Sequence, residues 1–167
     1  AGQFVGIVGH NGSGKSTLAK CMSGLLLPSS GAVSVLGMDP CDGKSQLAIR
    51  QAVGLVLQNP DNQFVATVVE EEVAFGPENL GVPRALLRQR VDQALADTGL
   101  AEMRLANPHT LSAGQKTRLA IAAVLAMAPP CIILDESSAM LDPISRAQLL
   151  ELLMRLHHSG MAVVMIT

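Results

Sequence analysis

The sequence lacks the residues that several classes of binding protein need. It has no Trp or Tyr, only three Phe, and a formal net charge of −2 over 167 residues. Single-stranded nucleic acid is usually bound on aromatic stacking surfaces, and nucleic acids of any kind attract basic proteins. The composition therefore argues against a nucleic-acid partner.

Long apolar runs and paired cysteines are missing as well. The longest apolar run, 119–128, has ten residues, whereas a helix that crosses a bilayer needs about 20. Cys21, Cys41 and Cys131 match no metal-binding or redox spacing. No signal peptide opens the chain, so we expect a protein of the reducing cytosol. Because 49% of the residues are hydrophobic and 16% are charged, we also expect a heavily buried sheet or a large contact surface.

Short apolar runs mark the expected strands. The run 31–37 alternates around Val33 and Val35 and predicts an antiparallel strand. Nearly continuous apolar runs, which are typical of strands buried on both faces of a sheet, lie at 3–9, 52–57, 131–136 and 161–167.

Helical patterns fill the segments between these runs. Helices are expected from about Lys15, over 83–99, over 114–128 and from Asp142 onward. Strands that alternate with helices predict an α/β fold with a mostly parallel sheet. We expect residues 1–60 and 111–167 to form its core. The more polar segment 61–110 is expected to form an inserted helical subdomain.

The first functional motif is a phosphate-binding loop. Residues 9–17, "GHNGSGKST", match G-x-x-x-x-G-K-[ST] and lie between an expected strand and an expected helix. In such a loop Lys15 reaches the β- and γ-phosphates of ATP and the Ser16 hydroxyl binds Mg²⁺. The candidate nucleotide-binding residues are Gly9, Asn11, Gly12, Ser13, Gly14, Lys15, Ser16 and Thr17.

A second motif places two carboxylates at the end of a buried strand. In "CIILDE", 131–136, Asp135 and Glu136 follow four apolar residues. The carboxyl edge of a parallel sheet is also where phosphate loops lie. We therefore expect Asp135 to order the Mg²⁺ shell and Glu136 to orient or deprotonate the attacking water. The alternative is an acidic strand end that faces solvent.

Five motifs in order give the chain a family resemblance. The phosphate loop is followed by Gln58 at a strand end, "LSAGQKTR" at 111–118, "IILDE" at 132–136 and "SAMLDP" at 138–143. This order resembles the P-loop NTPase core of ABC-type ATPases, with Gln58 as the Q-loop residue, LSAGQ as the signature and SAMLDP as the D-loop.

The resemblance implies a dimer of ATPase subunits that bind ATP between them. Ser112, Gly114 and Gln115 of one subunit are then expected to contact the γ-phosphate of the partner's ATP. Gln58 is expected to bind Mg²⁺ and the attacking water. Asp142 is expected to link the two sites across the dimer. Lys15, Gln58 and Glu136 are thus the expected catalytic residues, and Ser16, Gln58 and Asp135 the expected Mg²⁺ ligands.

A narrower resemblance lies in residues 57–83. "NPDNQ" and "EEVAFGPENLG" are similar to the ATPase subunits of energy-coupling-factor importers, which take up vitamins, cobalt or nickel. The partners implied are a second ATPase subunit, identical or different, a transmembrane coupling protein and a substrate-binding membrane subunit. The subunit would lie peripherally on the cytoplasmic face of the membrane. The acidic run 70–72 is then expected either to meet coupling helices or to form a solvated helix face.

Other functions and several departures from the pattern remain open at this stage. The alternatives are a soluble ABC ATPase of DNA repair or translation, and a nucleotide-binding regulatory module without hydrolysis.

Ala113 replaces a signature glycine, and unusual residues stand at Ser137, Ser138 and Met140. An adenine-stacking aromatic before Gly9 and a histidine after the last strand are absent. We therefore expect a piece of a longer subunit that binds and hydrolyses nucleotide poorly alone.

Overall fold

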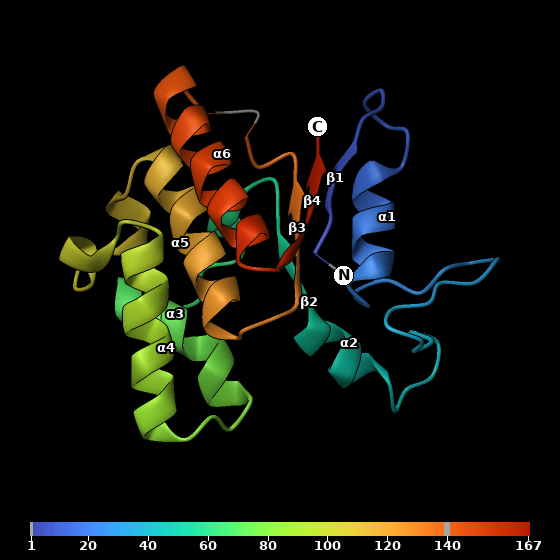
Figure 1. The fold of residues 1–167 in the computed structure, drawn as a ribbon, viewed down its shortest axis with the longest axis horizontal. Coiled ribbons are helices and arrows are strands. Elements are labelled where there is room, and N and C mark those ends of the chain that lie inside the picture. The colour runs from blue at the N-terminus through green and yellow to red at the C-terminus, as the bar shows by residue number, and fades with distance from the viewer. Residues whose placement is uncertain (1, 139–140) are drawn as a thin grey trace.

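The computed structural model describes residues 2–138 and 141–167 and shows a parallel sheet between two layers of helices (Figure 1). The four strands of the described sheet are β1 (Phe4–Ile7), β2 (Val53–Val56), β3 (Cys131–Asp135) and β4 (Ala162–Ile166). They lie in the order β1-β4-β3-β2, and every neighbouring pair is parallel. The expected α/β fold with a parallel sheet is confirmed.

Helices occupy both faces of this sheet. The α-helices of the described residues are α1 (Lys15–Met22), α2 (Gln46–Ala52), α3 (Val69–Asn79), α4 (Arg84–Asp97), α5 (Ala113–Ala126) and α6 (Pro143–His158). Short 3₁₀ turns lie at η1 (Pro60–Asn62), η2 (Ala101–Met103) and η3 (Pro108–Thr110). Helices α1 and α2 lie on one side of the sheet, and α3 to α6 lie on the other (Figure 1). None of the helices in the described part of the chain is long and apolar enough to cross a membrane.

Successive residues of the central strands face opposite layers, as the two-residue period of a strand requires. Ile132 and Leu134 of β3 pack with residues of α5 and α6, whereas Ile133 packs with Ala19 of α1. All four residues of β2 are buried. The strand predicted at 52–57 is therefore buried on both faces, as expected.

Two predictions about strands are wrong. Residues 31–37 form no strand, because Leu36 and Gly37 both have positive φ (50° and 80°) and turn the chain back at once. Only an isolated antiparallel bridge joins Val35 to Met38. Strand β1 is also not buried on both faces, since Val5 keeps 40% of its surface exposed. The physical reason is its position at the edge of the described sheet.

The segment 61–110 is helical, and helix α5 joins it to the sheet. Val73 of α3 and Leu95 of α4 are fully buried in a cluster that includes Leu119 of α5. The neighbouring Ile121 of α5 belongs instead to the cluster on the sheet. Whether 61–110 behaves as a separate subdomain stays a prediction. The packing shows that α5 serves both clusters.

Candidate functional site

The loop between β1 and α1 has the backbone geometry of an anion-binding site. Gly12 and Gly14 have φ of 80° and 91°, a conformation that is costly for residues with a Cβ. A Cβ built on Gly9 would lie 2.9 Å from the Ser13 hydroxyl oxygen, so the loop is closed tightly at that point. Helix α1 begins directly after Gly14, which has no side chain to cap it. Its first N–H groups and its positive dipole end therefore face the loop.

Lys15 lies at the centre of this loop with its ammonium group almost out of solvent. Its Nζ donates to the carbonyls of Gly9 (2.7 Å) and His10 (3.1 Å), and it lies 3.3 Å from Oε1 of Glu136. The Lys15 side chain is only 7% exposed, so these oxygens replace most of its water. A cavity of about 190 Å³ adjoins it and is lined by Gly12, Gly14, Lys15, Ser16, Thr17 and Glu136.

The next residue of the motif connects the loop to β3. The Ser16 hydroxyl donates to Oδ1 of Asp135 over 2.9 Å, and Asp135 is 3% exposed at the end of its strand. A hydroxyl oxygen and a carboxylate oxygen side by side match the oxygen ligands that Mg²⁺ prefers. Ser16 and Asp135, two of the expected Mg²⁺ ligands, thus lie side by side, and their binding of Mg²⁺ stays a prediction.

Glu136 is held from three directions. Its Oε2 accepts from Nε2 of Gln58 over 3.2 Å, its Oε1 faces Lys15, and its backbone N–H donates to the carbonyl of Ile166 over 3.1 Å. Its φ is 48°, in the left-handed region that residues other than glycine seldom adopt. Strain of this kind persists only where surrounding contacts enforce it, and it is concentrated at functional sites. Gln58, Glu136 and Lys15 meet here although they are far apart in the chain.

The signature segment forms a helix start with a capping box. The Ser112 hydroxyl accepts from the N–H of Gln115 (3.3 Å), and the Gln115 side chain accepts from the N–H of Ser112 (2.8 Å). This capping box leaves Ser112 and Ala113 exposed at the surface. Gly114 is buried, and a Cβ there would lie 2.7 Å from the Ser145 hydroxyl oxygen.

The phosphate loop and the signature do not meet within the chain. Helix α5 lies on the opposite side of the sheet from α1 (Figure 1). None of the hydrogen bonds or ion pairs found among residues 2–138 and 141–167 joins 112–115 to 9–17. The two motifs therefore lie apart within the chain, and their expected joint role at a nucleotide stays a prediction.

Comparison with known proteins identifies this arrangement. A family model described as "ABC transporter" matches residues 1–139. The chain belongs to the ABC transporter family of ATPases. Energy-coupling factor transporter ATP-binding protein EcfA1 of Caldanaerobacter subterraneus subsp. tengcongensis is 56% identical over 99% of this chain. EcfA of Methanosarcina acetivorans is 51% identical over the same share.

Solved structures of ABC proteins agree with the fold. The structure of cbiO1 from Clostridium perfringens, part of the ABC transporter complex cbiONQ, has a TM-score of 0.90 at 39% identity, over 99% of this chain and 67% of that one. A dimeric ATP-binding cassette in a post-hydrolysis state, bound to ADP and Pi, has a TM-score of 0.86 at 30% identity, over 99% and 75%. The chain spans about 60% of the length of the curated relatives that it matches.

Asp142, in the segment expected to be the D-loop, is the N-cap of helix α6. Asp142 caps the helix by accepting from the N–H groups of Ile144 and Ser145, both at 3.0 Å. Hydrogen bonding from Ser145 lowers the pKa of Asp142 below its ordinary range. Ser137 and Ser138 are buried, and Met140 lies outside the described residues. The predicted role of Asp142 between two subunits stays a prediction.

The acidic run after the Q-loop has three different environments. Glu71 is exposed, whereas Glu70 forms an ion pair with Arg104. Glu72 is 5% exposed and accepts from the N–H groups of Val65 and Ala66, both at 2.8 Å. The expected solvated face is therefore wrong for Glu72, because its carboxylate folds back to hold the preceding loop.

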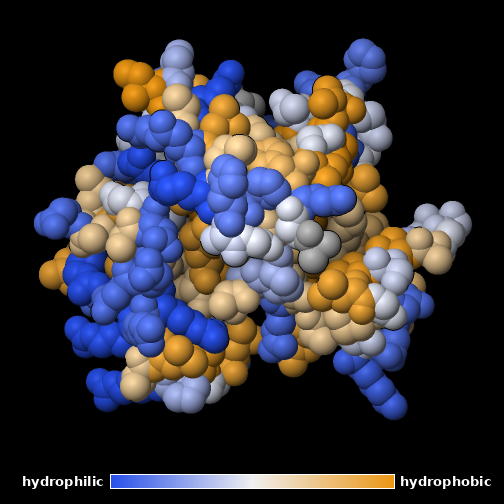
Figure 2. Space-filling view, in the orientation of Figure 1, coloured by the Kyte–Doolittle hydropathy of each residue, from blue (hydrophilic) through white to orange (hydrophobic). Residues whose placement is uncertain are grey.

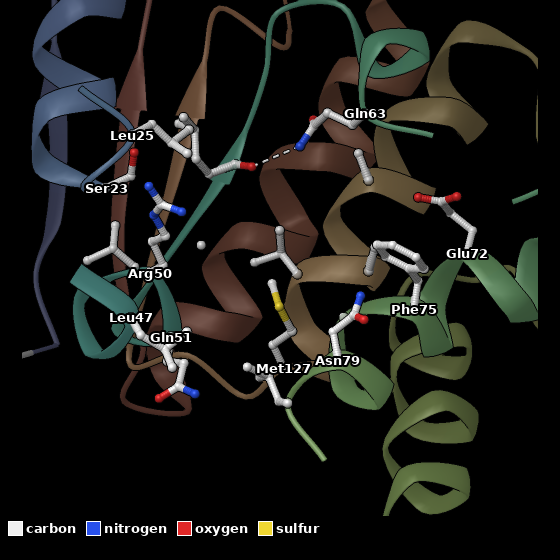
Figure 3. Close-up of a pocket in the computed structure, with 18 of the residues that line it drawn as sticks. Ser23, Leu25, Leu47, Arg50, Gln51, Gln63, Glu72, Phe75, Asn79 and Met127 are labelled. Atoms are coloured by element: carbon white, nitrogen blue, oxygen red, sulfur yellow. Dashed lines mark hydrogen bonds between the residues drawn. The ribbon is translucent and has the colours of Figure 1, made fainter. Parts of the chain in front are cut away.

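A groove of about 530 Å³ lies beside this loop, and sequence reasoning did not find it. Figure 3 shows Arg50 on one side of it, Phe75 and Glu72 on the other, and Gln63 at one end. Helix α2, which supplies Arg50, also lacked a prediction, since its seven residues are too few for a clear period.

Figure 2 shows hydrophilic residues over α4 and many apolar residues over the α1 side, where Leu18 and Leu27 are exposed.

Proposed function

We propose that this chain is the nucleotide-binding core of an ATP-hydrolysing subunit that powers an energy-coupling-factor importer of metal ions or vitamins. The observation that carries the proposal is the cluster of Lys15, Gln58 and Glu136 beside the Ser16–Asp135 pair. The names of the most similar relatives, which are energy-coupling factor ATP-binding proteins, support the transport role.

Each residue of the cluster has a distinct part in hydrolysis. Glu136 accepts the proton of the attacking water as general base, and Gln58 holds its carboxylate in place. Lys15 exchanges its contact with Glu136 for phosphate oxygens, which leaves Glu136 free for the water. Ser16 and Asp135 would hold Mg²⁺, which supplies charge neutralisation at the phosphates.

The backbone completes the binding of the phosphates. The first N–H groups of α1 have no helical carbonyl to bond, and the dipole of α1 favours negative charge at this end. These contributions need no side-chain movement, so the loop is preorganised for an anion.

The second half of the site is proposed to come from another subunit. Ser112 and Ala113 are exposed at the start of α5, away from the chain's own phosphate loop. The cassette bound to ADP and Pi that this chain resembles is dimeric. We therefore assign Ser112, Gly114 and Gln115 to the γ-phosphate of a partner's ATP. The partner is a second ATPase subunit of the same or a different sequence.

The remaining partners and the location follow from the transporter assignment. The subunit would bind a transmembrane coupling protein together with a substrate-binding membrane subunit. It would lie peripherally on the cytoplasmic face of the membrane. We include cobalt among the proposed transported metal ions because this chain is similar to cbiO1 of the cbiONQ complex.

Substitution of the general base tests the proposal. In the full-length protein that contains this chain, Glu136→Gln keeps the shape of the side chain but removes the base. We expect ATP turnover to fall by about 10²- to 10⁴-fold and an ATP-bound dimer to accumulate in size-exclusion chromatography. Glu151→Gln on the exposed face of α6 is the matched control and should keep full turnover. Turnover of Glu136→Gln at the unmodified rate would refute the assignment.

A further inference from the structure

The side chain of Gln63 acts as an extra residue of the sheet. Its Oε1 accepts from the N–H of Leu57 (2.8 Å), and its Nε2 donates to the carbonyl of Leu55 (3.0 Å). A residue of a parallel neighbouring strand makes the same two bonds: it donates to the carbonyl of residue i and accepts from the N–H of residue i+2. Figure 3 shows the amide of Gln63 at the end of the groove, bonded to the backbone of β2.

These bonds lie on the edge of β2 that no strand covers in the described sheet. β2 pairs with β3 on its other side, with Leu55 opposite Ile133. Without Gln63, the carbonyl of Leu55 and the N–H of Leu57 would lose their protein partners. The amide therefore continues the hydrogen bonding along β2 by one residue beyond Val56, to Leu57.

That extension ends directly at a catalytic residue. Leu57 precedes Gln58, whose Nε2 donates to Oε2 of Glu136 over 3.2 Å. Gln58 itself is exposed and has no other side-chain hydrogen bond among the described residues. Its position thus depends on the backbone before it and on the turn after it.

The turn after Gln58 is closed by short-range bonds. Asn59 caps η1 by accepting from the N–H of Asp61 over 3.1 Å. Asp61 in turn pairs with Lys116 on α5 at 2.8 Å. The turn brings Gln63 back alongside β2, so Gln58 lies in a loop whose two ends are joined by the Gln63 amide.

We propose that Gln63 is a positioning residue that acts on hydrolysis through Gln58 and Glu136. This inference rests on the proposed function, because it assumes that Gln58 and Glu136 carry out catalysis. Gln63 touches neither nucleotide nor water in this role. It fixes the strand end from which Gln58 reaches the general base.

A double-substitution cycle in the full-length protein tests the inference. Gln63→Met keeps the size of the side chain but removes both amide bonds, and Gln58→Ala removes the contact with Glu136. We expect Gln63→Met to lower kcat for ATP hydrolysis by about 10- to 100-fold, as small displacements of catalytic groups do, with KM changed less than about twofold. The double variant should have the same kcat as Gln58→Ala alone.

Two further variants separate positioning from loss of stability. Thr98→Val removes a buried side-chain bond to the Ala94 carbonyl (2.8 Å), far from the catalytic edge, and should keep full kcat. Gln63→Glu keeps the acceptor for Leu57 but loses the donor to Leu55, and should give an intermediate kcat. If circular dichroism shows that Gln63→Met is unfolded, Gln63→Glu replaces it in the double-substitution cycle with Gln58→Ala.

The outcomes distinguish this inference from the proposed function. Multiplicative losses in the double variant, or an unchanged kcat in the single variant at position 63, would overturn the role of Gln63. If Glu136→Gln in the same series abolishes turnover, the proposed function still stands in either case. If Glu136→Gln keeps its turnover, the proposed function fails first.

Discussion

Replacing Glu136 by Ala or by Gly removes the same carboxylate contacts but relieves the backbone to different extents. Both substitutions delete the bonds to Gln58 and Lys15. Only glycine relieves the left-handed φ of 48° at this position. The difference in stability between the two variants therefore combines the relief of backbone strain with the greater freedom of glycine in the unfolded chain.

The expected difference is small but measurable. A left-handed conformation costs an L-residue about 1–2 kcal/mol, whereas the greater freedom of Gly in the unfolded chain offsets about 0.4–1 kcal/mol. We expect Glu136→Gly to be more stable than Glu136→Ala by about 0.5–1 kcal/mol. For a protein of 150–250 residues this corresponds to about 1–4 °C in Tm.

Urea unfolding followed by far-ultraviolet circular dichroism provides the assay, because the chain has no Trp or Tyr for intrinsic fluorescence. Ala113→Gly is the control of opposite sign. Ala113 is the first residue of α5 and has negative φ, so glycine there should cost up to about 1 kcal/mol. If Glu136→Gly is no more stable than Glu136→Ala, the backbone at 136 is not strained in solution, and the reasoning fails.

Three further predictions concern packing, charge and the signature. A Cβ at Gly54 would lie 2.1 Å from Cγ1 of Val124, so Gly54→Ala should lower the unfolding free energy by about 1–3 kcal/mol in urea titrations, and adding Val124→Ala should recover part of it. Hydrogen bonding to Lys116 lowers the pKa of Asp61. The pair therefore stabilises the fold above the ordinary carboxyl pKa of 3.8 and stops doing so as pH falls through the lowered value, so the stability gap to Asp61→Asn should close only in acid. Ala113→Gly should raise ATP turnover in a steady-state assay if the methyl crowds the partner's γ-phosphate, and an unchanged rate would exclude crowding.

The grouping of the candidate catalytic residues was predictable because they lie at the ends of regular elements. Lys15 begins a helix after a strand, and Asp135 ends a strongly apolar strand. Parallel strands align their carboxyl ends, so motifs at those ends meet whatever their distance in sequence. The sequence placed Ser16 and Asp135 beside Mg²⁺, and the family resemblance placed Gln58, like Glu136, beside the attacking water; the contacts of the two pairs are compatible with these expectations.

The roles of Gln63 and Glu72 were not predictable from the pattern. Each side chain bonds to backbone groups of a nearby loop or strand edge. Such bonds depend on where the loop turns back, which leaves no period in the sequence. "NPDNQ" was visible as a distinctive segment, and Glu72 as part of an acidic run, but neither pattern reveals a backbone partner. The strand expected at 31–37 failed for a related reason: alternation does not show whether a neighbouring strand is available.

The ion pair between Lys15 and Glu136 joins the phosphate loop to the proposed general base. Within the chain, the Lys15 ammonium takes Glu136 as its counter-ion at 3.3 Å, with two loop carbonyls completing its contacts. A phosphate has more negative charge and several oxygens, so it is the better partner for the same ammonium. Under the proposed function, phosphate binding would draw Lys15 away from Glu136 and leave that carboxylate facing the attacking water.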